Sequence, residues 1–247
     1  MIAIRSKDEI ELLRKSGKVL ATIVGELKSS IRPGTATKDI DKKAEKLIEK
    51  FGAKPAFKGY RGFPSSTCIS INHEVVHGIP GSRILEEGSI VSVDIGLMLN
   101  EYFADTAFTA GVGKISSELT RLISVTRESL YRGIKEAVVD GHLSDISFAV
   151  QNFVESNNFS VVRDFVGHGI GKMLHEDPEV PNFGLPRSGP VLKEGMVLAI
   201  EPMVNLGTWR TKILEDGWTV VTADGKPSAH FEHTVAITGS GPEILTE

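Results

Sequence analysis

The chain has 247 residues, of which 40% are hydrophobic and 24% charged, a balance typical of a globular protein that buries a substantial core. Its formal net charge of −4 argues against nucleic acid as the main partner. Cys68 is the only cysteine, and neither a signal peptide nor a membrane-spanning apolar run is present. We therefore expect a single cytoplasmic domain over residues 1–247, with no membrane contact.

The first half of the chain predicts two helices followed by strands. Ser6 and Glu9 form a capping box ahead of apolar residues at helical spacing, which predicts a helix over residues 7–29. Thr37 is expected to cap a second helix that ends before Gly52. The β-prone runs that follow are Thr67–Ile71, Ser89–Ile95 and Tyr102–Ala110.

The second half of the chain predicts the same order of elements. Ser116 or Ser117 is expected to cap a third helix, and Ser144 a fourth. The β-like segments after these helices are Val161–Val166, Met196–Ile200 and His230–Ile237. Each half therefore consists of two helices and then strands.

A short internal repeat relates the two halves. Residues 84–94 and 191–201 align without a gap at an offset of 107, and each segment ends an apolar run on a carboxylate, Asp94 or Glu201. The repeat predicts an α+β fold with pseudo-two-fold symmetry, in which helices lie outside a curved, mainly antiparallel sheet. The halves are expected to be about 1–115 and 116–247.

Asp94 and Asp105 lie on two β-prone runs joined by a short turn. If the turn is centred between Leu99 and Asn100, paired residues sum to 199 and the two aspartates face each other directly. Two opposed like charges destabilise a sheet, and a bound cation would remove the repulsion. The alternative is a register shifted by one residue, with one aspartate exposed.

The second half contains matching carboxylates. Glu201 is the repeat counterpart of Asp94, and Pro202 after it favours an extended backbone. Glu232 stands where a counterpart of Asp105 is expected, on a following strand. Four inward carboxylates indicate two divalent cations rather than one.

Several histidines are candidates for the same site. His168 lies between glycines, which leave its imidazole unshielded, and it is the first choice for a nitrogen ligand. His175 could reach the pocket from a loop, and His77 resembles a third such position. His233 should point to the opposite face from Glu232 and is interpreted as structural, whereas the role of His230 is left open.

Together these residues resemble the type I methionine aminopeptidases, a family with the pita-bread fold. The motifs that carry the resemblance are Val75-Val76-His77-Gly78-Ile79-Pro80, Asp94 with Asp105, Gly167-His168-Gly169-Ile170-Gly171, Glu201-Pro202 and Phe231-Glu232-His233-Thr234. The resemblance implies two divalent metal ions (Co, Mn, Fe or Zn). The implied metal ligands are Asp94, Asp105, His168, Glu201 and Glu232.

The resemblance also implies a reaction and a substrate. The enzyme would remove the initiator methionine of nascent polypeptides when the second residue is small, acting as a monomer with transient ribosome association. Glu201 would move the proton, while His175 and His77 would contact the substrate. The slot for the methionine side chain would be lined by Tyr60, Phe63, Cys68, His77 and Trp218, with Phe57 nearby. Phe57 and Phe63 depart from the cysteine and tyrosine of many relatives.

Three other functions are compatible with parts of this pattern. A proline-specific peptidase of the same fold would share the ligands, but such enzymes usually carry an additional N-terminal domain. A non-catalytic binding module of the same fold would typically have lost ligands. A two-metal phosphoesterase is chemically possible, but no glycine-rich anion cradle begins a predicted helix.

Overall fold

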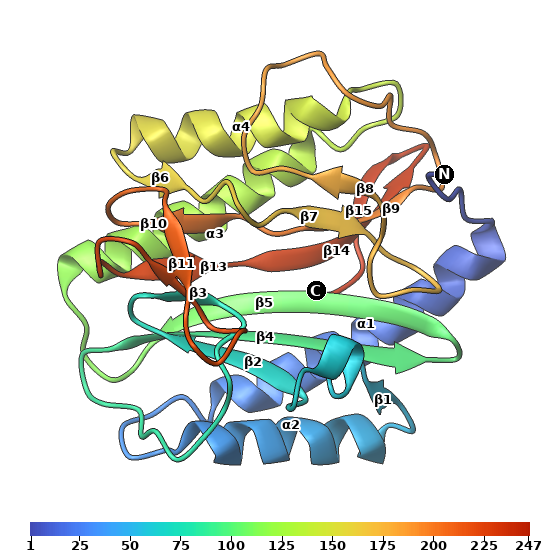
Figure 1. The fold of residues 1–247 in the computed structure, drawn as a ribbon. Helices are drawn as coiled ribbons and strands as arrows, with labels where there is room; N and C mark the ends of the chain where they lie inside the picture. The colour runs from blue at the N-terminus through green and yellow to red at the C-terminus, as the bar shows by residue number, and fades with distance from the viewer.

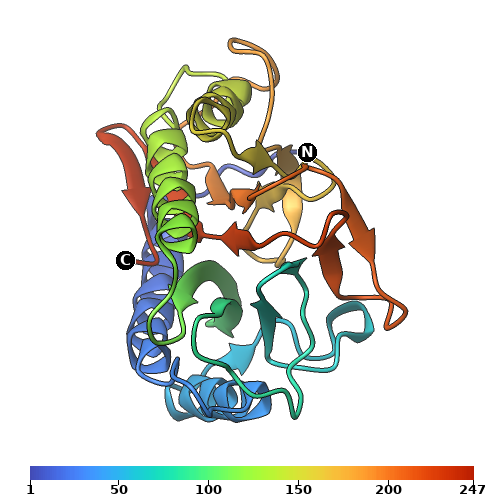
Figure 2. The ribbon, with the colours of Figure 1, turned by 90° about the vertical axis from the view of Figure 1, so that its left-hand side faces the viewer.

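The computed structural model describes residues 1–247, and its α-helices lie mainly on one side of a curved nine-stranded sheet (Figures 1 and 2). Helices α1 and α3 pack behind the sheet in the view of Figure 1, with α2 below and α4 above. The four helices are α1 (Lys7–Lys28), α2 (Thr37–Lys50), α3 (Ser117–Lys135) and α4 (Leu143–Ser156). This confirms the predicted α+β arrangement of helices outside a curved sheet.

The large sheet has the order β1-β4-β5-β14-β9-β7-β8, with β2 paired to β4 and β15 to β14. Two three-stranded sheets, β13-β10-β6 and β11-β12-β3, complete the structure, and every ladder is antiparallel. The strands are β1 (Lys54–Pro55), β2 (Thr67–Ile71), β3 (Glu74–Val76), β4 (Ile90–Leu99), β5 (Tyr102–Gly111), β6 (Ser160–Val161), β7 (Gly167–Gly169), β8 (Glu176–Val180), β9 (Val197–Ile200), β10 (Met203–Asn205), β11 (Thr211–Ile213), β12 (Val220–Thr222), β13 (Ser228–His230), β14 (Glu232–Thr238) and β15 (Gly241–Ile244). A short 3-10 helix, Tyr60–Gly62, precedes β2.

The internal repeat appears as equivalent backbone hydrogen bonds in the two halves. Thr37 N–H donates to the Arg83 carbonyl, and Leu143 N–H donates to the Pro190 carbonyl, both at 2.9 Å. The donors are 106 residues apart (143 − 37) and the acceptors 107 (190 − 83). The helices that these bonds anchor, α2 and α4, each have 14 residues. The four central strands β4-β5-β14-β9 are therefore related across the β5–β14 boundary by pseudo-two-fold symmetry.

Two of the predicted helix caps are wrong, and for the same reason. Helix α2 is capped by Ala36, and the cap of α4 lies two residues before Ser144. The Thr37 hydroxyl donates to the carbonyl of Gly81 and accepts from its N–H, and the Ser144 hydroxyl makes the same two bonds with Ser188. These hydroxyls bond each helix to the segment that precedes β4 or β9, so both side chains make tertiary contacts and neither caps its helix.

The other helix starts follow the sequence prediction. Ser6 and Glu9 form the expected capping box, and the Ser116 side chain caps α3. Buried leucine and isoleucine side chains of α1, among them Leu20 and Ile23, share one hydrophobic core with β4. Burying each such side chain stabilises the fold by about 1.5–3 kcal/mol, which fixes the position of β4 relative to the helices.

The β4–β5 hairpin has a different register from the one expected. Asp94 pairs with Ala107 and Asp105 with Gly96, so paired residues sum to 201. The two turn residues, Asn100–Glu101, have φ values of 51° and 66°, as a type I′ hairpin turn requires. A turn one residue earlier would have placed a leucine at positive φ. Asp94 and Asp105 are therefore diagonal neighbours on one face rather than directly opposed.

The strand expected over Val161–Val166 is also shorter than predicted. Only Ser160–Val161 is β-structure, and the chain leaves the sheet after Val162, where Arg163 and Asp164 are exposed. The two charges interrupt the apolar pattern and direct this segment into a loop that leads to β7.

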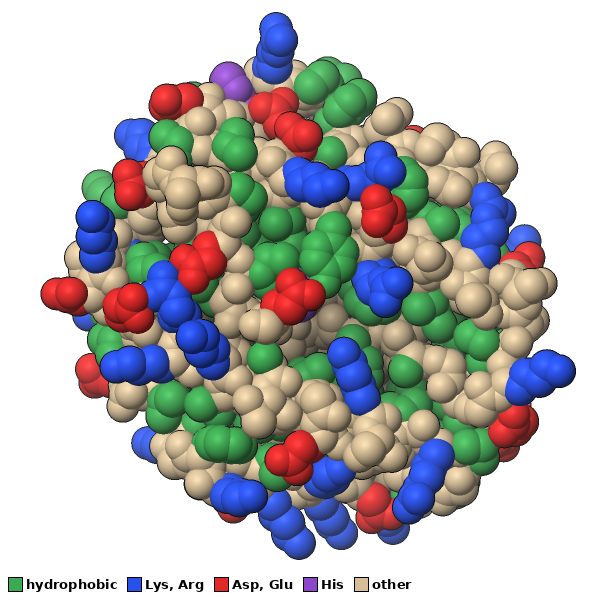
Figure 3. All heavy atoms as spheres, turned by 180° about the vertical axis from the view of Figure 1, so that it is seen from behind, with side chains coloured by type: hydrophobic (Ala, Val, Ile, Leu, Met, Phe, Trp, Pro, Cys, Tyr) green, Lys and Arg blue, Asp and Glu red, His purple; other side chains and the backbone are tan.

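Figure 3 shows the helix-covered face, on which charged side chains of both signs are interspersed. None of the helices combines the length and apolarity required to span a bilayer.

Candidate active site

All eleven predicted site residues line one cavity of about 150 Å³. A cavity of that order can take up a molecule as small as benzene, and hence one side chain. Its lining consists of Phe57, Tyr60, Arg61, Phe63, Cys68, His77, Asp94, Asp105, His168, Leu174, His175, Glu201, Trp218 and Glu232.

Four adjacent strands supply the carboxylates of the cavity. Asp94 lies on β4, Asp105 on β5, Glu232 begins β14, and Glu201 follows the last residue of β9. Ala107 pairs with both Asp94 and Glu232, so these two carboxylates occupy one row across the sheet. The pseudo-symmetric strand order thus brings together two carboxylates from each half.

Asp105 and Glu232 are buried, Asp94 and Glu201 are partly buried, and several of their oxygens have no partner. Burial, followed by the charge of Asp105, raises the pKa of Glu201 and of Glu232 well above the usual value, and the pKa of Asp94 rises for the same reasons. Burial raises the pKa of Asp105 to about 7. Asp94 Oδ1, Asp105 Oδ1 and Glu232 Oε1 have no hydrogen-bond partner. Unpaired buried oxygens of this kind are costly, and divalent cations would satisfy them.

His168 supplies a nitrogen to the same cluster. Its Nδ1 lies 2.9 Å from the Gly169 carbonyl, which can only accept, so Nδ1 carries the proton and Nε2 keeps its lone pair. Burial lowers the pKa of His168 to about 4, and the ring is therefore neutral at pH 7, as a metal ligand must be. Ligand atoms of Asp105, His168 and Glu232 lie within 4.8 Å of one another.

Glycines flanking His168 are required by close backbone packing. A Cβ at Gly167 would overlap the carbonyl oxygen of Ala199, and one at Gly169 would overlap that of Asp177. β7 therefore lies against its neighbours more closely than any other residue would allow. The glycines on both sides of His168 therefore allow the close strand packing that positions its side chain.

His175 faces the cavity from the loop after β7. Its ring stacks on Tyr60 with centroids 5.2 Å apart and lies 4.2 Å from the His168 ring centroid. Nδ1 of His175 is 3.0 Å from the Tyr60 hydroxyl. His175 is exposed as a residue, but desolvation of its ring inside the cavity, then the charges of His168, Arg61 and His77, lowers its pKa. The ring is therefore neutral near pH 7.

His77 and the aromatic residues form the apolar end of the cavity. The His77 ring lies edge-on to Phe165 and to Trp218, with centroids 5.6 Å and 6.4 Å apart, and Phe63 packs edge-on against Trp218 at 5.2 Å. The backbone N–H groups of Trp218 and Thr219 both donate to one carboxylate oxygen of Asp216. This turn fixes the indole at the wall of the cavity.

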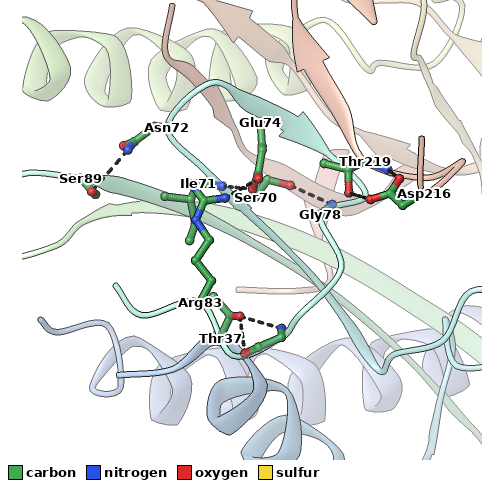
Figure 4. A network of polar contacts seen from close by, with 11 residues as sticks. Thr37, Ser70, Ile71, Asn72, Glu74, Gly78, Arg83, Ser89, Asp216 and Thr219 are labelled. Carbon is green, nitrogen blue, oxygen red and sulfur yellow. Dashed lines mark hydrogen bonds and ion pairs between the residues drawn. The ribbon is translucent and has the colours of Figure 1, made fainter. Parts of the chain in front are cut away.

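A polar network holds the segment around His77, which has a φ of 60° (Figure 4). Before it, Glu74 accepts from Ile71 N–H at 2.7 Å and forms an ion pair with Arg83. After it, Gly78 N–H donates to the Ser70 hydroxyl at 3.2 Å. The loop is thus closed at its ends, which offsets the strain of a left-handed backbone at a histidine.

Threonine hydroxyls hold together the boundary between the two halves. Thr234 Oγ1 donates to the Asp105 carbonyl at 2.8 Å and accepts from Asp105 N–H at 3.0 Å. Thr106 Oγ1 donates to the Glu232 carbonyl at 2.6 Å. Backbones of two carboxylate residues are therefore fixed by side chains where the β5–β14 ladder is short.

Two of the four remaining histidines flank Glu232 in the sequence. His233 lies on the opposite face of the sheet, bonded through Nδ1 to the Thr246 hydroxyl at 2.8 Å. His230, left open from the sequence, is buried beside Glu201, with 3.7 Å between Nε2 and Oε2.

Sequence reasoning missed Arg61 and Leu174 in the cavity lining. Both are sequence neighbours of predicted site residues, Tyr60 and His175, and adjacency was the only available signal. Arg61 has a φ of 49°, which composition and spacing do not reveal.

The profile of Metallopeptidase family M24 matches residues 11–239. Over 246 residues the chain is 58% identical to the methionine aminopeptidase of Clostridium perfringens, covering 100% of this chain and 99% of that protein. Methionine aminopeptidase 1 of Bacillus subtilis is 54% identical over 246 residues, with the same coverage. The chain belongs to metallopeptidase family M24, and it is therefore a metal-dependent hydrolase.

Solved structures place it within that family more closely. The crystal structure of methionine aminopeptidase from Thermotoga maritima superposes with a TM-score of 0.98, at 47% identity and 100% coverage of both chains. The prolidase from Pyrococcus furiosus superposes with a TM-score of 0.81 at 25% identity, covering 99% of this chain and 65% of that one. Similarity over full length is therefore to the methionine aminopeptidases, which confirms the resemblance drawn from the motifs.

Proposed function

We propose that the protein is a dinuclear metalloaminopeptidase that removes an N-terminal methionine when the second residue is small. The observation that carries this proposal is the single cavity in which five potential ligands adjoin an apolar pocket of one side chain's size. The full-length similarity of the chain to methionine aminopeptidases supports methionine as the residue that is removed.

Five residues would hold the metal ions. These would be Asp94, Asp105, His168, Glu201 and Glu232, the carboxylates and the imidazole that line the cavity. Three carboxylate oxygens without partners support this assignment. Oxygen-rich ligation with one imidazole suits Mn, Fe, Co or Zn. When bound, two such ions would lower the pKa of a water molecule toward neutrality and polarise the scissile carbonyl.

Side chains around the ligands would handle the protons. Glu201 would accept the proton of the attacking water and deliver it to the departing amine. If the Tyr60 hydroxyl donates to Nδ1 of His175, then Nε2 carries the proton and can donate to the scissile carbonyl as negative charge develops. His77, neutral because burial lowers its pKa, would hydrogen-bond the peptide nitrogen that follows the methionine.

The apolar wall would select the methionine. Aromatic rings of Phe63 and Trp218 with the thiol of Cys68 form a polarisable surface suited to a thioether. Phe57 and Phe63 make this wall more apolar than a cysteine and a tyrosine would. We expect them to change inhibitor preference without abolishing methionine recognition, since each methylene contributes only about 1–3 kcal/mol.

The test is hydrolysis by metal-reconstituted protein of a peptide panel. We expect Met-Ala-Ser to be cleaved, with Leu-Ala-Ser and Met-Leu-Ser at least tenfold slower, and two equivalents of metal at full activity. Glu232→Gln, which keeps the side chain's size, is the matched inactive control. Protein that contains two equivalents of metal and cleaves none of these peptides would refute the proposal.

A proline-specific peptidase is the second candidate, because the prolidase fold is shared. Similarity to the prolidase is lower in identity and covers less of its chain, so this activity is less supported than methionine removal. Adding Ala-Pro-Ser to the panel decides between the two.

As natural substrates we propose nascent polypeptides in the cytoplasm. A monomer would process them during protein maturation, while it is transiently associated with the ribosome. Comparing its co-sedimentation with translating and with empty ribosomes tests this.

A further inference from the structure

His230, the last residue of β13, is a buried imidazole without a hydrogen-bond partner. Its side chain is 1% exposed, and neither Nδ1 nor Nε2 has a partner among the other residues. An imidazole carries at least one N–H donor in either protonation state, and a buried donor without an acceptor is costly.

The carboxylate of Glu201 lies close to this ring. Its two oxygens are divided between two imidazoles: Oε1 lies 3.7 Å from His168 Nε2, and Oε2 lies 3.7 Å from His230 Nε2. The His230 separation exceeds hydrogen-bond length by about 0.5–1 Å, a gap that a small carboxylate rotation closes. His168 lines the cavity together with the candidate ligands, whereas His230 does not line it.

The backbone of His230 cannot readily move away. Thr109 Oγ1 donates to the His230 carbonyl at 2.8 Å and accepts from its N–H at 2.9 Å. The Ser92 hydroxyl in turn lies 2.8 Å from Thr109 Oγ1. A side chain held this firmly and aimed at one carboxylate can determine how that carboxylate is oriented.

We propose that His230 is a positioning residue that donates from Nε2 to Glu201 Oε2. This bond fixes the carboxylate plane and keeps Oε1 turned toward His168 and the ligand cluster. The consequence for turnover rests on the proposed function, but the hydrogen bond itself does not.

The first test separates the donor from the volume of the side chain. His230→Leu removes the donor, and we expect kcat for Met-Ala-Ser to fall about 10–100-fold with KM changed less than threefold. His230→Gln restores an N–H donor at similar reach and should recover kcat to within fivefold. Equal loss in both variants, or none in either, overturns the proposal.

The second test requires no activity. A double-mutant cycle of His230→Leu and Glu201→Leu, followed by urea unfolding of the metal-stripped full chain, should show about tenfold coupling in the unfolding equilibrium constant. Additive effects overturn the proposal. If the wild type cleaves no peptide, the proposed function fails while this cycle still decides the role of His230.

His233→Leu is the matched control. It removes a partly buried histidine, on the opposite face, together with its bond to Thr246. We expect lower stability, kcat within threefold of the wild type and no coupling to Glu201. A loss of kcat equal to that of His230→Leu would show that any buried histidine has this effect and would overturn the proposal.

Discussion

The two halves of the molecule bring their carboxylates to the same centre by different means. Asp94 and Asp105 are eleven residues apart (105 − 94) on one regular hairpin of two ten-residue strands. Glu201 and Glu232 are 31 residues apart (232 − 201), and the strands around them have four and seven residues. A long local ladder positions its own side chains, whereas short strands from distant parts of the chain need additional contacts. Glycine packing around His168 and the Thr106 and Thr234 hydroxyls supply those contacts.

The largest effect is expected where the two halves meet at Asp105. Asp105→Asn removes a negative ligand, and we expect kcat/KM for Met-Ala-Ser to fall by about 10³-fold or more, several kcal/mol. Stability should change in the opposite direction, because the amide relieves repulsion in the metal-stripped protein. Urea unfolding of that form checks this, and a variant that is both active and unchanged in stability would contradict the assignment.

The repulsion shared by both halves should also appear as a pH dependence. Asp105 has a folded pKa of about 7 against an ordinary value of 3.8, so the folded state holds more protons between these values. The Asp105 contribution to the stability of the metal-stripped protein is therefore complete below about pH 4 and is lost as pH rises through 7, by about 1 kcal/mol or more, while histidines with a lowered pKa, such as His168, contribute in the opposite direction. Thermal unfolding of the stripped wild type and of Asp105→Asn across this range isolates the Asp105 contribution as the difference between the two proteins. A wild type that becomes more stable relative to Asp105→Asn from pH 4 to 7 would contradict it.

Glycine substitutions sharpen the comparison between the halves. Gly169→Ala sets a Cβ against the carbonyl oxygen of Asp177, whereas Gly96→Ala meets mainly the side chains of Phe57 and Ala56, at 2.9 Å and 3.0 Å. Backbone yields less than side chains, so Gly169→Ala should destabilise by about 1–3 kcal/mol more than Gly96→Ala. Unfolding midpoints measured with metal decide this, and equal losses would show that packing is no tighter in the second half.

The smallest effect is expected at the boundary between the halves. Thr234→Val keeps the shape of the side chain but loses both hydroxyl bonds to Asp105, and we expect a loss of about 1–3 kcal/mol in stability. Thr234→Ser should recover most of it. Urea titration of the three proteins gives the comparison, and a fully stable valine variant would show that the hydroxyl is unnecessary.

Predictions from the sequence succeeded where local patterns decide the structure and failed where turn conformation or distant contacts decide it. Local patterns identified the capping box at Ser6, the strand Thr67–Ile71 and the repeat that ends on Asp94 and Glu201. The hairpin register failed because it depends on which two residues adopt positive φ, Asn100 and Glu101, and apolar alternation does not determine this. Ser144 was misassigned because its hydroxyl bonds Ser188, a contact 44 residues away. Non-local hydrogen bonds of this kind leave no periodic trace in a sequence.

The late position of Glu232, on β14, has a consequence for biosynthesis. Residues up to 115 supply only two of the five proposed ligands, and the last of them, Glu232, lies on β14. A chain translated only as far as β9 would therefore lack part of the proposed ligand set. If the site acts as proposed, hydrolysis begins only after β14 has paired with β5 of the N-terminal hairpin.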